Sequence, residues 1–268
     1  GGKSARSDWM KMEQDRGISI ASTVLQFEYE GTIVNLLDTP GHRDFSEDTY
    51  RVLSAVDAAI MVLDAAKGIE AQTLKLFEVC RARNMPIITF INKWDRPSLD
   101  PLELIDQIEQ AIGVQTTPMT WPVGPGGEFE GVINRQTNQF IRYTRTSRGA
   151  TEALEETVEL GPNNQIESDY LQIALEEVQL LDEIGASHDQ ELFLAGETSP
   201  LFFGSALTNF GVRHLLNAVV DFAPSPSERE TDDGAKRDID SSFSAFVFKV
   251  QANMDPSHRD RVAFMRIN

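Results

Sequence analysis

Two short polar motifs stand directly after apolar runs of strand length, and this arrangement restricts the fold more than any other feature of the chain. Asp38-Thr39-Pro40-Gly41-His42 follows the run at 32–37, and Asn92-Lys93-Trp94-Asp95 follows the run at 85–91. Open α/β sheets bind ligands at the carboxyl ends of buried strands. Either motif alone is typical of a polar turn. In the first motif, proline fixes its own φ near the value that a turn needs, and glycine allows backbone angles that other residues rarely adopt. Two such motifs, each after a strand, favour a binding site.

The pattern around the motifs alternates between strand and helix. Such alternation is typical of βαβ units, in which helices join parallel strands. The sequence therefore predicts an α/β fold with a mostly parallel sheet. The expected elements are strand 32–37, a polar helix near 44–54, strand 57–63, helix 70–83, strand 86–91 and helix 101–112, the last opened by Asp100-Pro101.

From Pro118 onward the pattern changes to glycine, proline and short β-like stretches at 129–133 and 140–144, which predict a small hairpin region. Residues 167–184 then carry apolar side chains at helical spacing, with acidic side chains on the other side. This amphipathic helix is followed by a last apolar strand at 200–204 and a helix at 211–222. The apolar stripe of the amphipathic helix is Leu171, Ala174, Leu175, Val178 and Leu181.

A polar, proline-containing acidic stretch at 224–242 suits a linker. Strand-like segments follow at 243–250 and 261–267. We therefore expect one domain over 1–223 with an insertion at about 120–199, the linker 224–242, and the opening strands of a second domain at 243–268, which the end of the chain interrupts.

The composition predicts a cytoplasmic protein. With 268 residues and 41% hydrophobic side chains, the chain can bury the cores of two domains. No apolar stretch approaches the roughly 20 residues that span a bilayer, and the first residues lack the apolar core of a signal peptide. The single cysteine, Cys80, allows no disulfide within the chain and is expected on the buried face of a helix.

The acidic charge is unevenly distributed. A net charge of −18 argues against salt-driven adhesion to nucleic acid. Thirteen acidic residues and no lysine or arginine lie between Arg148 and Arg213, which leaves about −5 for the remainder. We call residues 149–212 the acidic block. We expect it to face solvent or a basic protein rather than RNA, so neutralising several of its glutamates should leave nucleotide binding unchanged.

The two motifs resemble the third and fourth guanine-nucleotide motifs of GTPases. A GTPase needs a carboxylate near Mg²⁺, backbone donors at the terminal phosphate and a group that reads the base. By this analogy Asp38 reaches Mg²⁺ through a water. The amide of Gly41 suits the γ-phosphate, because a residue without Cβ allows a close approach. His42 is the candidate to position the attacking water.

The second motif is the candidate for recognition of the base. The carboxylate of Asp95 can accept hydrogen bonds from both N1 and N2 of guanine, an arrangement that adenine cannot satisfy. Asn92 and Lys93 would brace the site, with the lysine stem lying along the base. Ser205-Ala206-Leu207 follows the last apolar strand, where a backbone amide would reach the carbonyl oxygen of guanine.

Upstream, Ser19 carries a hydroxyl that would ligate Mg²⁺ when a triphosphate is bound. The phosphate-binding pattern Gly-x-x-x-x-Gly-Lys-Ser/Thr does not occur in residues 1–268. We therefore expect the first strand and its P-loop to precede Gly1, and we expect residues 1–268 alone to lack GTPase activity.

Beyond the motifs, nearly the whole chain resembles the translational GTPases, and within that family the branch that acts in termination. The resemblance implies a P-loop-type GTPase domain with an inserted α+β subdomain, followed by the start of a β-barrel domain. The segments that carry it are residues 7–10, 16–20, 35–50, 92–96, 120–122, 191–197 and 248–266.

The resemblance also implies the function and the site. Such proteins hydrolyse GTP on the ribosome and drive off the codon-reading release factor, with ribosomal RNA engaging the catalytic histidine, here His42. The cofactors would be GTP or GDP and Mg²⁺, the latter held by Ser19 and Asp38. Neither DNA nor a membrane is expected as a partner, and no heptad seam suggests self-association. The candidate GTP-binding residues are Asp38, Thr39, Pro40, Gly41, His42, Asn92, Lys93, Trp94, Asp95, Ser205, Ala206 and Leu207.

Two alternatives stay open at this point. The chain could belong to an elongation-factor-G-like translocase or a ribosomal protection protein, which share the GTPase motifs but should lack the segment at 251–261. It could instead be a degenerate GTPase that docks without hydrolysis. The absent P-loop favours that alternative, whereas the intact motif at 38–42 counts against it.

Overall fold

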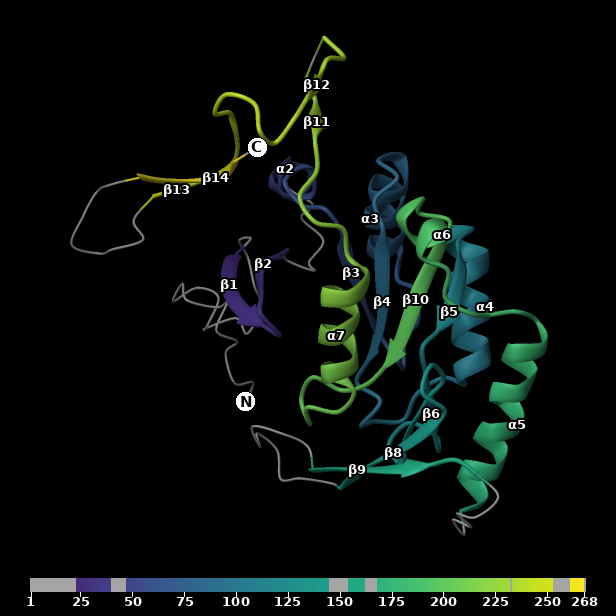
Figure 1. Ribbon diagram of the computed structural model, residues 1–268. Coiled ribbons are helices and arrows are strands. Elements are labelled where there is room, and N and C mark those ends of the chain that lie inside the picture. Colours follow the sequence, from purple (N-terminus) through teal and green to yellow (C-terminus); the bar gives the residue numbers. More distant parts are fainter. Residues whose placement is uncertain are drawn as a thin grey trace. The chain divides into compact units, whose positions relative to one another are not determined.

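The computed structural model describes residues 23–39, 47–144, 154–161, 168–231, 233–252 and 261–267. These residues form two compact units, each considered by itself. One unit is residues 58–223, and the other combines the described parts of 1–57 and 224–268. Figure 1 shows the elements of both units along the chain. No helix of the described residues is long and apolar enough to cross a membrane.

A four-stranded parallel sheet organises the unit 58–223 (Figure 1). Its central strands are buried along nearly their whole length, which explains the apolar run of β4 and the apolar second half of β10. The strands, in spatial order, are β3 (Ala59–Asp64), β4 (Ile87–Asn92), β10 (Thr198–Phe203) and β5 (Gln115–Pro118). All three pairings are parallel, which confirms the α/β fold with a mostly parallel sheet.

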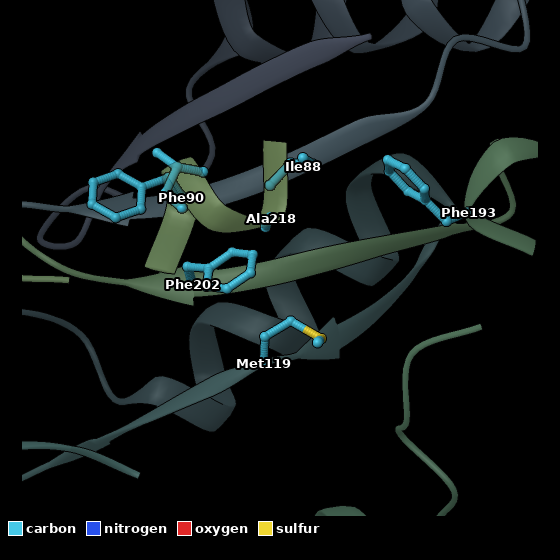
Figure 2. Packing of buried hydrophobic residues seen from close by; sticks show 7 residues of the cluster. Ile88, Phe90, Met119, Phe193, Phe202 and Ala218 are labelled. Carbon is cyan, nitrogen blue, oxygen red and sulfur yellow. The ribbon is translucent and has the colours of Figure 1, made fainter. Parts of the chain in front are cut away.

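One face of this sheet packs against α7 (Val212–Phe222). The same buried cluster includes a residue of the short helix α6 (Gln190–Leu194). Figure 2 shows most of its side chains converging between the strands and the helices. The cluster consists of Ile88, Phe90, Met119, Phe193, Phe202, Leu215 and Ala218. The predicted helix at 211–222 thus forms and buries its apolar stripe.

The helices α3 (Ala71–Ala82) and α4 (Pro101–Ile112) lie behind the sheet in the view of Figure 1, where α7 lies in front. α4 begins as predicted, because the Asp100 side chain accepts hydrogen bonds from the amides of Leu102 and Glu103 at 2.9 and 3.2 Å. Cys80 of α3 is buried, and burial raises the pKa of its thiol to about 11. The predicted place of Cys80 on the buried face of a helix is therefore confirmed.

A second, antiparallel sheet is inserted between β5 and β10. It has four strands in the order β6-β7-β8-β9, so it is larger than the small hairpin region that the sequence predicts. Among the described strands, β9 pairs with β8 alone, and its three glutamates give it the composition of a polar surface segment. The strands are β6 (Thr120–Val123), β7 (Gly131–Asn134), β8 (Gln139–Thr144) and β9 (Leu154–Glu159).

Helix α5 (Asp169–Glu183) packs beside β6 of the inserted sheet. Trp121 of β6 donates from its indole nitrogen to the Glu177 carboxylate at 2.8 Å. The buried guanidinium of Arg135 donates to the carbonyls of Pro118 and Ala186 at 2.6 and 2.7 Å. The predicted amphipathic helix is confirmed, with Leu171, Ala174, Val178 and Leu181 buried.

The other unit contains an antiparallel hairpin of β1 (Thr23–Tyr29) and β2 (Thr32–Asp38). Its turn consists of Glu30 and Gly31, both at positive φ (46° and 74°), as a two-residue type I′ turn requires. The strand at 32–37 was expected from its apolar sequence, but β1 was not. β1 forms because it pairs with β2, because its side chains alternate in burial, and because the Glu30-Gly31 turn joins the two strands.

A second hairpin of this unit consists of β13 (Ala245–Ala252) and β14 (Arg261–Ile267), and it packs against α2 (Glu47–Ser54). Strands were predicted at both places. The stretch expected as a linker, 224–242, carries the short pair β11 (Arg229–Glu230) and β12 (Lys236–Arg237). The domain boundaries themselves stay a prediction.

Candidate functional site

The candidate site lies where β4 and β10 end. These strands are parallel neighbours, with Ile91 opposite Phe203, so the loops that follow them leave the sheet at the same edge. The loop after β4 carries the motif at 92–95, and the loop after β10 carries Ser205 and Ala206. The structure thus brings together the two segments that the sequence assigns to base recognition.

Asn92 ties the two loops together. Its side-chain oxygen accepts hydrogen bonds from the amide of Lys93 at 2.8 Å and from the amide of Ala206 at 2.9 Å. One bond closes the turn of its own loop, and the other crosses to the loop after β10. Asn92 therefore links the two loops, whereas its role in bracing a bound nucleotide stays a prediction. Substitution by aspartate would preserve only the acceptor atoms.

Asp95 is oriented by Ser205. The Ser205 hydroxyl donates to Oδ1 of Asp95 at 2.5 Å, and Ser205 itself is fully buried. The Asp95 side chain remains 14% exposed, with Oδ2 3.8 Å from Nε of Arg96. A carboxylate accepts about four hydrogen bonds, so one anchored oxygen leaves the group able to accept two parallel N–H donors from a ligand. This is the arrangement that the N1 and N2 donors of guanine require.

Lys93 is held by a residue that the sequence reasoning missed. Its ammonium donates to Oδ2 of Asp64 at 2.6 Å, and Oδ1 of Asp64 accepts from the Ala66 amide at 2.9 Å. Partial burial alone would raise the pKa of the Asp64 carboxyl, but the hydrogen bonds from Lys93 and Ala66 lower it below its ordinary value. Asp64 ends β3, opposite Asn92 in the sheet. Its place at the carboxyl end of a predicted strand was a signal that could have found it.

Trp94 supports the site from within the core. Its side chain is fully buried and meets Phe203 edge to face, with 5.0 Å between ring centroids. The indole nitrogen donates to the Gly124 carbonyl at 3.3 Å, and the Trp94 amide donates to the Gly204 carbonyl at 3.0 Å. Of the residues predicted at the nucleotide, Trp94 is thus one whose side chain positions the loops rather than facing a ligand.

The loop after β10 is shaped by Gly204 and Gly211. A Cβ on Gly204 would lie 2.4 Å from the Phe210 carbonyl oxygen, so this position has no room for a side chain. Gly211 has φ 72° and caps α7. Between them Ser205 and Phe210 exchange backbone hydrogen bonds at 2.9 and 3.0 Å, which close the loop and leave Ala206 and Leu207 exposed.

The first motif lies in the other unit. Asp38 ends β2 opposite Thr23, and Thr39 follows it. Pro40, Gly41 and His42 lie outside the described residues, as does Ser19. Among the described residues there is no cluster of histidine, cysteine, aspartate or glutamate that could hold a metal ion.

A cleft of about 480 Å³ opens at the amino ends of β4, β5 and β10, the opposite edge of the parallel sheet. Arg81, Gly113 and Glu197 are among the residues that line it. Within it, Nη1 of Arg81 donates to the Ile112 carbonyl at 2.9 Å. The two loops that the sequence assigns to base recognition lie at the other edge, so we place the candidate site at the carboxyl edge.

The fold and these loops define a translational GTPase domain, and the chain belongs to the elongation factor Tu GTP-binding domain family, which matches residues 1–225. The chain is 54% identical over 269 residues to peptide chain release factor 3 of Staphylococcus aureus, and 53% identical over 267 residues to that of Listeria innocua serovar 6a. Each alignment covers 99% of this chain, which spans about half the length of these relatives, 51% in both. The resemblance found in the sequence is thus confirmed.

Among solved structures, a crystal structure of a protein from Thermus thermophilus matches 97% of this chain with a TM-score of 0.70. It shares 22% sequence identity, and the match covers 39% of that protein. At this identity the likeness supports the fold alone.

Proposed function

We propose that the loops after β4 and β10 bind the base of GTP or GDP. The observation that carries this proposal is the Asp95 carboxylate, which the buried Ser205 hydroxyl holds at the carboxyl edge of the sheet. Guanine presents two adjacent donors to such a carboxylate, whereas adenine presents an acceptor at N1. A base that leaves this polar group unpaired is strongly disfavoured, so the site selects guanine over adenine.

Because the chain belongs to this family, we assign the phosphate end of the nucleotide to the first motif. Asp38, through a water, and the Ser19 hydroxyl would hold Mg²⁺, which neutralises charge on the phosphate oxygens. The Gly41 amide would contact the γ-phosphate, and His42 would position the attacking water. These roles rest on the sequence of the motif and on the family, since Ser19, Gly41 and His42 lie outside the described residues.

In the complete protein we propose that this domain hydrolyses GTP on the ribosome and promotes dissociation of codon-reading release factors after peptide release. The support is 54% identity to peptide chain release factor 3 along 99% of this chain, together with family membership over residues 1–225. The partners would be the ribosome, through its RNA and proteins, and a codon-reading release factor. The protein would act in the cytoplasm, where translation takes place.

A ribosome assay tests this function. The full-length protein and GTP should accelerate the turnover of a codon-reading release factor on post-release ribosomes, and they should not accelerate translocation. The variant His42→Ala should lower ribosome-stimulated GTP hydrolysis by about a hundredfold, because it removes the group that positions water. Its affinity for GDP should stay within about twofold of the unmodified protein.

The opposite pattern would contradict the proposal. Stimulated translocation without release-factor turnover would assign the protein to the elongation-factor-G-like alternative. Tight ribosome binding with no hydrolysis would assign it to the docking alternative.

A further inference from the structure

Arg266, near the end of β14, makes an extensive ionic contact within the unit that contains it. Its Nη1 donates to the Ala55 carbonyl at 2.9 Å and to Oδ2 of Asp57 at 2.8 Å, and its Nη2 donates to Oδ1 of Asp57 at 2.8 Å. The two side chains are only 12% and 23% exposed. A two-pronged pair shielded from water in this way is stronger and more directional than an exposed ion pair.

Apolar packing reinforces this contact. Phe248 of β13 is buried together with Val52 and Ala55, from α2 and the residue just after it. Phe264 of β14 packs against the same cluster. The hairpin therefore meets α2 with an apolar surface and fixes the turn after α2 with a guanidinium. Both contacts join segments about 200 residues apart in the sequence.

The same cluster reaches the strand that precedes the catalytic motif. Leu37 of β2 packs against it, and Leu37 is followed directly by Asp38. α2 begins at Glu47, five residues after His42. The buried cluster to which Phe248 of the hairpin belongs thus touches both the element before the motif at 38–42 and the element after it.

We propose that Arg266 and Asp57 form a clamp that makes α2 and the β13–β14 hairpin move as one body when the nucleotide changes. Arg266 is then a positioning residue for the motif at 38–42, acting through Asp57 and Ala55. The clamp itself follows from the contacts within this unit. Its consequence for turnover rests on the proposed GTPase function.

Hydrogen exchange tests the clamp without reference to activity. In the full-length protein, Arg266→Met should accelerate amide exchange in both α2 and β13 by about tenfold, because one strong, shielded contact is lost. Arg261→Met, at an exposed position on the same strand, should change neither element. Faster exchange in the hairpin with α2 unaffected would overturn the clamp.

A charge swap separates the clamp from simple destabilisation. Asp57→Arg and Arg266→Asp should each accelerate exchange in α2, and the double variant should recover part of the protection because the pair is restored in reverse. If the double variant instead loses as much exchange protection in α2 as the two single variants combined, Arg266 and Asp57 do not form a specific pair. Unchanged affinity for GDP, whose proposed base site lies in the other unit, shows that the unit 58–223 of each variant is folded.

The consequence for turnover has its own readout. Arg266→Met should lower ribosome-stimulated kcat about tenfold while the KM for GTP and the affinity for GDP stay within about twofold. Unchanged kcat with faster exchange in α2 would overturn the positioning role. If the unmodified protein shows no GTP hydrolysis at all, the proposed function fails, whereas the exchange experiment still decides the clamp.

Discussion

At the residue scale, Ser205 determines how Asp95 is presented. Its hydroxyl donates to the carboxylate at 2.5 Å and is fully buried, so Ser205→Ala should leave Asp95 without its orienting partner. We expect the affinity for GDP to fall about tenfold, the effect of losing one hydrogen bond to a charged group. Titration with fluorescently labelled GDP measures it. Ser98→Ala is the matched control, because the Ser98 hydroxyl donates only to the backbone carbonyl of Leu99.

His214 of α7 should make stability depend on pH. Burial, and secondarily the charge of Arg213, lower the pKa of His214 from 6.5 to about 4. Between those values the unfolded chain binds more protons than the folded one, so the free energy of unfolding falls as the pH drops. The loss from this group reaches at most about 3 kcal/mol at pH 4.

Urea unfolding between pH 4 and 7 checks this dependence. His214→Gln should lose less stability over that range than the unmodified protein, because it has no imidazole to protonate. If the free energy of unfolding of the two proteins falls in parallel as the pH drops, His214 is not responsible for the pH dependence of stability.

Sequence reasoning singled out Asn92, Asp95 and Ser205, whose loops the structure joins by hydrogen bonds, but it did not single out every supporting residue. Asn92, Asp95 and Ser205 follow predicted strands, and the parallel sheet brings those strand ends together. Asp64 was missed because no motif marks it, although it pairs with Lys93. The burial of Trp94 depends on Phe203 and Gly124, which lie far away in the sequence, so no local pattern distinguishes its side chain from one that faces a ligand.

At the scale of elements, α4 shows a local signal that determines a boundary. Asp100 accepts from two amides of the first turn, and Pro101 follows at the first helical position. Asp100→Ala should lower the free energy of unfolding by about 1 kcal/mol, the usual cost of losing such a cap. Asp106→Ala, at an exposed position in the same helix, should change it much less. Urea unfolding distinguishes the two, and equal losses would refute the capping role.

The elements that the sequence did not predict are those formed by tertiary pairing. β1 owes its strand structure to β2 and to the turn at Glu30 and Gly31. β9 pairs with β8 despite three glutamates in six residues. By contrast, the central strands contain apolar runs, and the helices at 101–112 and 212–222 have their own helical periodicity. These elements form within two residues of the predicted ranges.

At the scale of the whole molecule, the negative charge of the acidic block should not affect nucleotide binding. The acidic block includes exposed glutamates on α5 and α6, and the candidate base site uses none of them. The triple variant Glu176→Gln, Glu183→Gln and Glu191→Gln should therefore bind GDP within about twofold of the unmodified protein. A large loss of GDP affinity would show that the block takes part in nucleotide binding.

Selection of guanine is the central claim, and one competition experiment tests it most directly. The full-length protein is titrated with fluorescently labelled GDP and then challenged with unlabelled GDP or ADP. The geometry of Asp95 and Ser205 predicts that GDP displaces the label, whereas ADP fails even at about a hundredfold higher concentration. Equal displacement by ADP, or no binding of labelled GDP, would contradict a guanine site in the loops after β4 and β10.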